Sequence, residues 1–282
     1  MLWNKPKRSE KVDDQRKDKD VRSNTGVMLA AGLAASLGVG SLAYWLVELV
    51  KDPAAVAAKA KAELDAAKSP PKRDDPHLVF VEAVLGSTEE VWTELMALTG
   101  QQYQPPTLVL YNGKISTGCD VVSAIELGPV YCPEDQKIYI DLDSLGEIAT
   151  TSSSVSDFAQ AVVIAHEVGH HVQNLSGVLT SLDEALSRDE PLIGANELSV
   201  RRELQADCLA GVWAQAAQAK FNWLEPGDIE EALTMVTTYG DDKLGATPES
   251  FTHGTSQQRL NWFNTGFNDI EADCRTFDDA TL

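Results

Sequence analysis

The chain has 282 residues, of which 43% are hydrophobic and 23% charged, as in a globular protein that buries a substantial core. Its formal net charge is −20. Binding to nucleic acid requires clustered Lys and Arg that displace counterions from phosphates, so we expect no nucleic-acid partner.

The first 26 residues differ from the rest in charge. They contain eight basic and five acidic residues and few apolar ones, so their net charge is +3 in an otherwise acidic chain. A segment of this composition cannot bury enough apolar surface to fold by itself. We therefore expect residues 1–26 to form a basic, disordered leader.

An uncharged apolar stretch from Gly26 to Val47 follows the leader. About 20 apolar residues, each rising 1.5 Å in a helix, match the roughly 30 Å thickness of a hydrocarbon core. We interpret residues 27–50 as a single transmembrane helix; a cleaved signal peptide and a buried core helix are the alternatives. The leader would then be cytoplasmic, and everything after residue 50 would lie outside the membrane.

Residues 51–76 are expected to form a stalk and linker, because the consecutive prolines Pro70 and Pro71 break an Ala- and Lys-rich helix. The compact domain then covers residues 77–282. Its first helix is predicted to begin at the capping box Ser87–Glu90 and to end at Gly100.

A β-rich stretch is predicted next. Residues 107–111 and 114–117 flank Asn112-Gly113, a typical sequence for a two-residue hairpin turn. Strands are also expected at 121–127 and 137–142, and helices at 156–176, 196–220, 228–240 and 256–263. Strands first and helices afterwards indicate a mainly helical α+β domain with a small antiparallel sheet.

Four cysteines, Cys119, Cys132, Cys208 and Cys274, suggest two disulfides in a domain outside the cytoplasm. Cys119 and Cys132 could meet across a hairpin, which leaves Cys208 and Cys274 as the other pair. The sequence alone permits three connectivities, and a cysteine can also serve as a small buried hydrophobe.

The segment His166-Glu167-Val168-Gly169-His170 carries the strongest chemical signal. Its two histidines are four residues apart, so on a helix they share one face and can bind the same Zn²⁺. Glu167 lies beside them, where a general base could reach a water on the metal. Gly169 inside this apolar helix suggests the close approach of another backbone.

A catalytic zinc usually has three protein ligands, and Glu203 on the next predicted helix is the best candidate for the third. Asp207 is four residues on, where it could accept the second N–H of a ligand histidine. The alternative is a solvated acidic face paired with Arg201 and Arg202. The apolar residues around Glu203 make that alternative a poor fit.

Segments 166–173, 203–213 and 253–259 resemble the neutral zinc metallopeptidase family typified by the bacterial YpfJ proteins, and the likeness extends over nearly the whole chain. HExxH followed by ExxxD is also similar to the gluzincin pattern of thermolysin-like peptidases. The resemblance implies a zincin-like domain with one Zn²⁺ on His166, His170 and Glu203, Glu167 as the base, and Asp207 behind a histidine.

His253 and Arg259, six residues apart, resemble a pair in Ste24-like peptidases. His253 could donate to the oxyanion of the transition state, or merely cap a turn. Arg259 could form an ion pair with Asp207. His171 points about 100° away from His170 and is expected to pack rather than to bind metal.

The sequence therefore predicts a zinc metallopeptidase in the inner membrane of a bacterium, with its catalytic domain outside the cytoplasm and a peptide or protein as substrate. An amidase that acts on cell-wall peptides is a second interpretation. A catalytically silent scaffold stabilised by zinc is a third, although such a site would need no Glu167.

Overall fold

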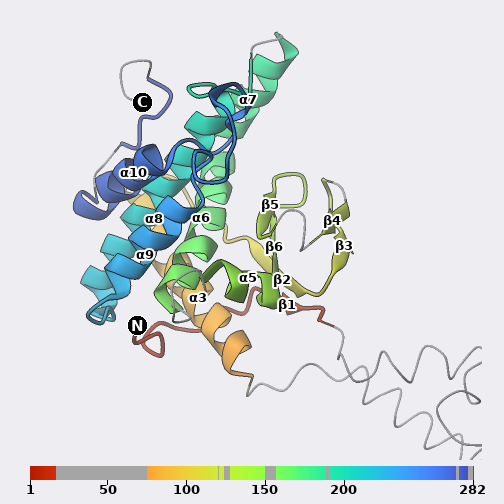
Figure 1. Ribbon diagram of the computed structural model, residues 1–282. Coiled ribbons are helices and arrows are strands. Elements are labelled where there is room, and N and C mark those ends of the chain that lie inside the picture. Colours follow the sequence, from red (N-terminus) through yellow and green to blue (C-terminus); the bar gives the residue numbers. More distant parts are fainter. Residues whose placement is uncertain are drawn as a thin grey trace, which may run out of the picture. The chain divides into compact units, whose positions relative to one another are not determined.

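The computed structural model describes residues 1–16, 75–119, 121–123, 128–149, 157–188, 191–270, 273–278 and 282 (Figure 1). Contacts divide the chain into two units, Met1–Asp13 with Asp74–Leu282, and Asp14–Arg73, and the fold below is that of the first. Its strands are β1 (Val12–Asp14), β2 (Thr107–Tyr111), β3 (Lys114–Ser116), β4 (Val121–Ser123), β5 (Val130–Cys132) and β6 (Lys137–Asp141). Its helices are α3 (Pro76–Leu98), α5 (Leu142–Ala149), α6 (Asp157–Leu175), α7 (Val178–Ser187), α8 (Leu198–Phe221), α9 (Asp228–Thr238), the 3₁₀ turn η1 (Pro248–Ser250) and α10 (Ser256–Asn268).

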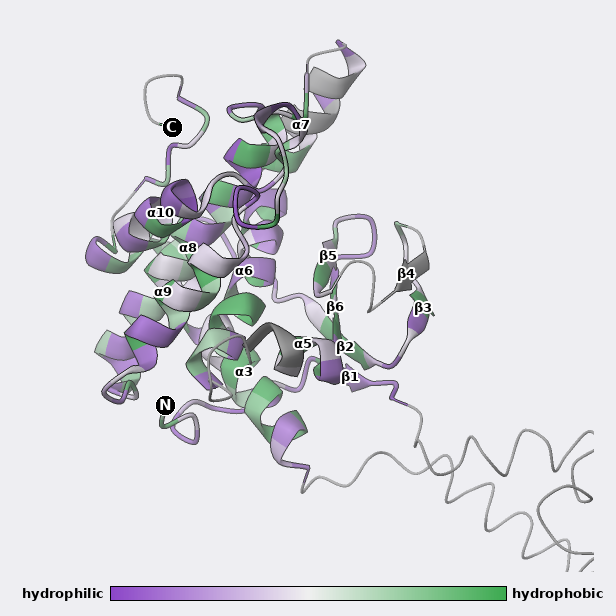
Figure 2. Cartoon of the chain, viewed as in Figure 1, coloured by the Kyte–Doolittle hydropathy of each residue, from purple (hydrophilic) through white to green (hydrophobic). Residues whose placement is uncertain are grey.

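The helices form the larger part of the domain. Helix α6 packs against α8 and α9, and α10 packs along α8, while α3 contacts both α6 and α8. Hydrophobic residues run along α3 and α6, and the outer turns of α10 are hydrophilic (Figure 2). Phe158, Trp213, Trp223 and Phe263 are fully buried between these helices. This core holds α6 and α8, the two helices on which the candidate ligands lie.

The main sheet has the strand order β1-β2-β6-β5. Strand β2 pairs with β6 in parallel, from Thr107 opposite Lys137 to Tyr111 opposite Asp141, whereas β5 pairs with β6 antiparallel. The sheet is therefore mixed, and the prediction of an antiparallel sheet is wrong. Strand β5 lies at the edge of this sheet and contacts α6.

The predicted hairpin at Asn112-Gly113 does not form. Strands β2 and β3 flank it as expected, but β2 pairs with β6, and β3 pairs with β4. A two-residue hairpin turn of this sequence needs a positive φ at both residues. Here only Gly113 has one, at 75°, and its N–H donates to Asp141 Oδ2 at 3.2 Å. That hydrogen bond ties the turn to the end of β6.

Helix α3 begins earlier than predicted. Asp75 is its N-cap and accepts from the N–H of His77, with Pro76 in the first turn. The hydroxyls of Ser87 and Thr88 donate to carbonyls of the preceding turn, so they lie within the helix. The capping-box interpretation is wrong, because the apolar residues before Ser87 are buried and continue the helix.

Helices α6, α8 and α9 lie within two residues of their predicted ends, whereas α10 continues to Asn268, five residues beyond the predicted end at Phe263. Strand β5 and helix α7 are not predicted from the sequence. Strand β5 is three residues long and lies between Pro129 and Pro133, which are turn signals. Helix α7 begins directly after Gly177, which has a positive φ of 80° and lies two residues beyond the end of α6 at Leu175.

The leader is folded over residues 1–16, so the expectation of disorder is wrong there. Strand β1 lies beside β2, where Leu108 N–H donates to Lys11 O at 2.9 Å, and the Met1 side chain is buried. These residues are ordered by contacts with the domain, and amino-acid composition does not reveal such contacts. Residues 17–26 and the predicted anchor 27–50 lie outside the described residues. Among the described helices, none has the length and apolar character needed to cross a membrane.

Both predicted disulfides are present. Cys119 is bonded to Cys132 and joins the loop after β3 to β5, while Cys208 is bonded to Cys274 and joins α8 to the C-terminal segment. All four cysteines are therefore paired.

Candidate metal centre

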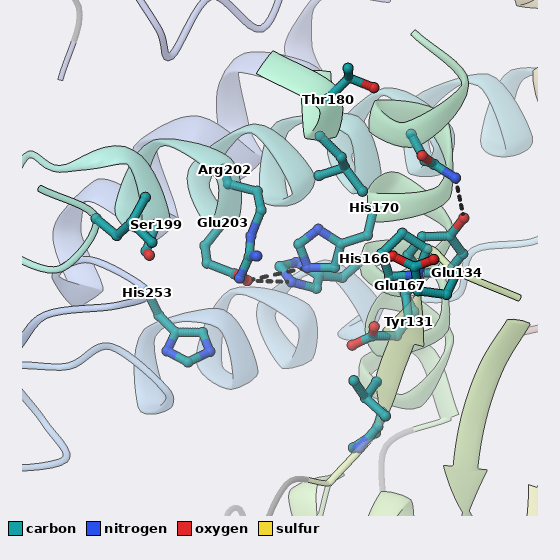
Figure 3. Close-up of a pocket in the computed structure, with 16 residues that line it drawn as sticks. Tyr131, Glu134, His166, Glu167, His170, Thr180, Ser199, Arg202, Glu203 and His253 are labelled. Atoms are coloured by element: carbon teal, nitrogen blue, oxygen red, sulfur yellow. Dashed lines mark hydrogen bonds and ion pairs between the residues drawn. The ribbon is translucent and has the colours of Figure 1, made fainter. Parts of the chain in front are cut away.

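Three side chains from two helices converge as the sequence predicts. His166 and His170 lie one turn apart on α6, and Glu203 reaches them from α8 (Figure 3). Glu203 Oε2 is 3.1 Å from His166 Nε2 and 3.3 Å from His170 Nε2. Two ligands at 2.0–2.1 Å on a tetrahedral zinc are separated by about 3.3 Å. Both the atoms and their spacing therefore fit a zinc ion.

Gly169 allows α6 and α8 to approach closely enough for this arrangement. A Cβ atom at this position would lie 3.1 Å from Ala206 O and 3.2 Å from Ala206 Cα. A larger side chain would push the α8 backbone away from α6. The suggestion of a close backbone approach at Gly169 is thus confirmed.

Asp207 lies behind His166. Its Oδ1 is 2.9 Å from His166 Nδ1, and Arg259 donates to both of its oxygens, from Nε at 2.8 Å and Nη2 at 2.9 Å. Arg259 also donates to Tyr239 O at 2.9 Å. The carboxylate therefore fixes the orientation of the imidazole, which leaves Nε2 of His166 directed at Glu203.

Burial and charge act in opposite directions on these groups. Burial lowers the pKa of His166, but its hydrogen bonds to Asp207 and Glu203 outweigh burial and raise that pKa to about 10. Burial raises the pKa of Glu203, but the His170 charge and the hydrogen bonds from both histidines bring it well below its ordinary value. Glu203 is therefore ionised at neutral pH and available as a ligand.

Gln173 fixes the orientation of the His170 ring, as Asp207 fixes that of the His166 ring. Gln173 Oε1 lies 2.8 Å from His170 Nδ1, and its Nε2 donates to Arg202 O at 2.8 Å and to Gln205 Oε1 at 2.9 Å. Because the amide nitrogen donates elsewhere, the amide oxygen accepts from the histidine and leaves His170 Nε2 for a metal. The sequence analysis assigns Gln173 no role, although its position three residues after His170 places it on the same face of α6.

Substitution of Gln173 by Ala is expected to weaken zinc binding by about 10–100-fold, because His170 loses the acceptor that fixes its ring. Competition with a chromophoric chelator measures this affinity. Gln257 on α10 bonds only a nearby Asn261 at 2.8 Å and offers a matched Gln→Ala control on the surface. Equal zinc affinities of the two variants would show that Gln173 does not support the ligand.

Arg202 occupies the second oxygen of Glu203. Its Nη2 donates to Glu203 Oε1 at 2.6 Å and its Nε at 3.1 Å. Oε1 is thus engaged on one side of the carboxylate, and Oε2 faces the two imidazoles. This arrangement favours coordination of zinc by Glu203 Oε2 alone.

The ligands open into a cavity of about 780 Å³. Glu167 lines this cavity although only 7% of its surface is exposed, so it lies beside the ligands in a largely desolvated position. His253 lines the same cavity, and Figure 3 shows it at the other end of the view from Glu167 and Glu134. The predicted base and the predicted oxyanion donor thus border one cavity with the ligands.

The loop that carries His253 is held by Asp241. Three successive N–H groups, of Thr252, His253 and Gly254, donate to Asp241 Oδ2 at 2.7–2.8 Å. The sequence gives no sign of this role for Asp241. The three hydrogen bonds come from backbone groups, which leave no pattern in the side chains, and the other carboxylate oxygen, Oδ1, lies 3.6 Å from His253 Nδ1.

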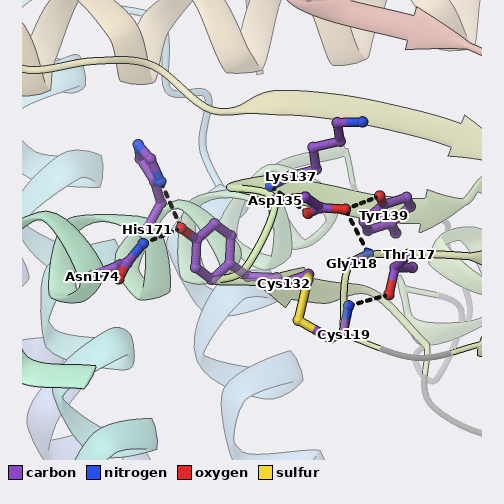
Figure 4. The surroundings of a disulfide bond; sticks show 10 residues. Thr117, Gly118, Cys119, Cys132, Asp135, Lys137, Tyr139, His171 and Asn174 are labelled. Atoms are coloured by element: carbon purple, nitrogen blue, oxygen red, sulfur yellow. Dashed lines mark hydrogen bonds between the residues drawn. A yellow bond between two sulfur atoms is a disulfide. The ribbon is translucent and has the colours of Figure 1, made fainter. Parts of the chain in front are cut away.

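His171 connects α6 to the sheet, as expected of a packing residue. Its Nδ1 lies 2.9 Å from the Tyr131 hydroxyl and its Nε2 lies 2.6 Å from Gln104 O. Tyr131 adjoins Cys132, so the disulfide to Cys119 lies close to this contact (Figure 4). The edge strand β5 is thereby fixed beside the cavity.

A second acidic group, Asp157, Asp228 and Glu231, also brings three oxygens together. The amino group of Met1 lies 3.0 Å from Asp157 and 3.4 Å from Asp228, so these carboxylates already have a cationic partner. The described residues thus offer one set with the mixed nitrogen and oxygen donors that zinc prefers, at His166, His170 and Glu203.

Comparison with known proteins agrees with this site. The chain is 38% identical over 290 residues to a protein of Escherichia coli strain K12, "Uncharacterized protein YpfJ", across 98% of this chain and 99% of the relative. It is 39% identical over 219 residues to "Uncharacterized protein Rv2575" of Mycobacterium tuberculosis, across 72% and 71% of the two chains. No solved structure matches the chain significantly. The model of one family, described as "Putative neutral zinc metallopeptidase", matches residues 1–277, and the chain belongs to that family.

Proposed function

We propose that the protein is a zinc-dependent peptidase that hydrolyses peptide bonds in protein or peptide substrates. The observation that carries the proposal is the convergence of His166, His170 and Glu203 at ligand spacing, with Glu167 beside them on one cavity. One zinc ion per chain would be held by these three residues. A purely structural site needs ligands but no neighbouring base and no cavity, so the arrangement favours an enzyme.

Zinc in such a site acts as a Lewis acid toward the scissile carbonyl and makes water acidic enough to attack near neutral pH. Glu167 takes the proton from the attacking water and later delivers it to the leaving amine. Its burial removes competing solvent, so the proton passes between the carboxylate and the reacting groups. His253 donates to the oxyanion that develops on the substrate, from a loop held in place by Asp241.

The substrate would bind as an extended segment along β5. This strand lies at the edge of the sheet, and Val130 and Tyr131 line the cavity beside Glu167. An edge strand offers backbone N–H and C=O groups to which a peptide can add by strand pairing. A peptide paired with β5 in this way would have its scissile bond next to Glu167.

Replacement of Glu203 by Ala is expected to weaken zinc binding more than Gln173→Ala does, because it removes a ligand rather than the support of one. Titration of both variants against the same chelator measures the difference. If Glu203→Ala binds zinc as tightly as the parent chain, the assignment of the third ligand is wrong.

The direct test of the proposed function is cleavage of a fluorescently quenched casein by the purified full chain. We expect cleavage with one equivalent of zinc, loss of cleavage after chelation, and recovery when zinc returns. Tight binding of zinc without cleavage of casein or of a random peptide library would instead support a zinc-stabilised scaffold. Cleavage that persists in the metal-free chain would contradict the role of the metal.

A further inference from the structure

The described part of the leader is bound to the domain through backbone hydrogen bonds at Leu2, Ser9 and Lys11. Leu2 N–H donates to Trp223 O at 2.7 Å, near the end of α8, and Ser9 N–H donates to Glu82 O at 2.9 Å, within α3. Together with the pairing of β1 beside β2, these bonds join three separate parts of the domain to the first residues of the chain.

Side chains of the leader add to this attachment. The ring of Trp3 lies edge-on to Phe80, with 6.1 Å between the ring centroids. Lys5 Nζ donates to the carbonyls of Phe221 and Asn222, at 3.1 and 2.6 Å, where α8 ends. A cation at the C-terminus of a helix is favoured by the helix dipole. The positive charge of Lys5 in the leader therefore lies against the C-terminal end of α8 in the domain.

Gly86 provides the closest contact between leader and domain. A Cβ atom on Gly86 would lie 1.8 Å from Lys7 O and 3.0 Å from Ser9 N. The leader backbone thus rests directly on α3 at a position that accommodates no side chain. The three nearest atoms to this Cβ position among the described residues all belong to the leader.

We propose that residues 1–13 and the domain that begins at Asp75 lie on the same side of any membrane that this chain enters. They belong to one folded unit, and strand pairing between β1 and β2 cannot extend across a bilayer. A cytoplasmic leader combined with a catalytic domain outside the membrane is therefore incompatible with this folded unit. The family model matches residues 1–277, so the matched sequence includes the leader.

Cysteine labelling in intact cells tests this inference. The parent chain gives the background labelling, because all four of its cysteines are in disulfides and should not react. Glu10→Cys in the leader and Glu249→Cys in η1 each place a thiol at an exposed position away from the ligands. We expect both variants to react equally with a membrane-impermeant maleimide, or both to react only after lysis. Reaction of one site in intact cells and of the other only after lysis would overturn the proposal.

A pair of glycine variants of the full chain tests the docking itself. Gly86→Ala should lower the thermal midpoint and speed the proteolytic release of the leader, although Ala favours helices by about 1 kcal/mol. Gly146→Ala in α5 is the matched control, because among the described residues no atom beyond its chain neighbours and its own helix backbone lies within 4 Å of the added Cβ. If Gly86→Ala is as stable and as protease-resistant as Gly146→Ala, the leader does not dock as described, and the shared-side inference fails with it.

Discussion

Glu167→Gln is expected to lower the rate of peptide hydrolysis by about 10²–10⁴-fold while leaving zinc affinity unchanged. The amide has nearly the shape of the carboxylate, so the buried position should keep its packing. It cannot accept a proton from water near neutral pH, so the general base is lost. Comparison of kcat/KM and of zinc affinity for the two proteins separates these effects.

Glu134 offers the control for this substitution. It lines the same cavity but is exposed, on the turn after β5. Glu134→Gln changes the charge of the cavity by the same amount without removing the predicted base, so its effect on kcat should be small. Equal losses in the two variants would mean that cavity charge, rather than proton transfer at Glu167, controls the rate.

Arg259→Ala is expected to destabilise the protein by about 3–5 kcal/mol, because it leaves the buried Asp207 without its principal cationic partner. Asp207 and Arg259 are 2% and 6% exposed and form two hydrogen bonds with each other. Burial favours the protonated form of Asp207, but the Arg259 charge and hydrogen bonds keep the pKa of this carboxyl below its ordinary value. Urea unfolding of parent and variant measures the difference in the free energy of unfolding.

Arg275→Ala is the control for the loss of an arginine, because Arg275 and its partner Asp273 are both well exposed. An exposed pair of this kind contributes about 0–1 kcal/mol. The stability of Arg259→Lys should lie between those of the parent and Arg259→Ala. Lysine keeps the positive charge but cannot form the bidentate pair with the Asp207 carboxylate. If Arg259→Ala is no less stable than Arg275→Ala, the buried pair does not hold α10 against α8.

The sequence predicts the candidate metal ligands more completely than the residues that hold the site in place. His166, His170 and Glu203 follow a spacing that helix geometry translates directly into a shared face, and the structure brings the three together. Gln173 shares that spacing and could have been found by the same argument. Asp241 could not, because it binds three backbone N–H groups that any sequence would supply.

In the fold, too, features set by local sequence are predicted well, whereas those set by contacts between distant segments are not. Helices α6 and α8 are predicted to within two residues of their ends, whereas α10 continues five residues beyond its predicted end at Phe263. The parallel pairing of β2 with β6 joins strands 30 residues apart in the sequence, and the local turn signal at Asn112-Gly113 favours a different partner. The leader is a stronger case, because its backbone hydrogen bonds to the domain join Leu2 to Trp223, Ser9 to Glu82 and Lys11 to Leu108, which are far apart in the sequence.

X-ray absorption at the zinc edge, on the full chain loaded with one equivalent of zinc, tests the metal centre most directly. The account predicts nitrogen and oxygen ligands at about 2.0–2.1 Å with the outer scattering of two imidazoles, and no sulfur at about 2.3 Å. Mutation of His166 or His170 to Ala should remove imidazole scattering or the bound metal. Sulfur ligation, or an unchanged spectrum in both histidine variants, would contradict a zinc ion held by His166, His170 and Glu203.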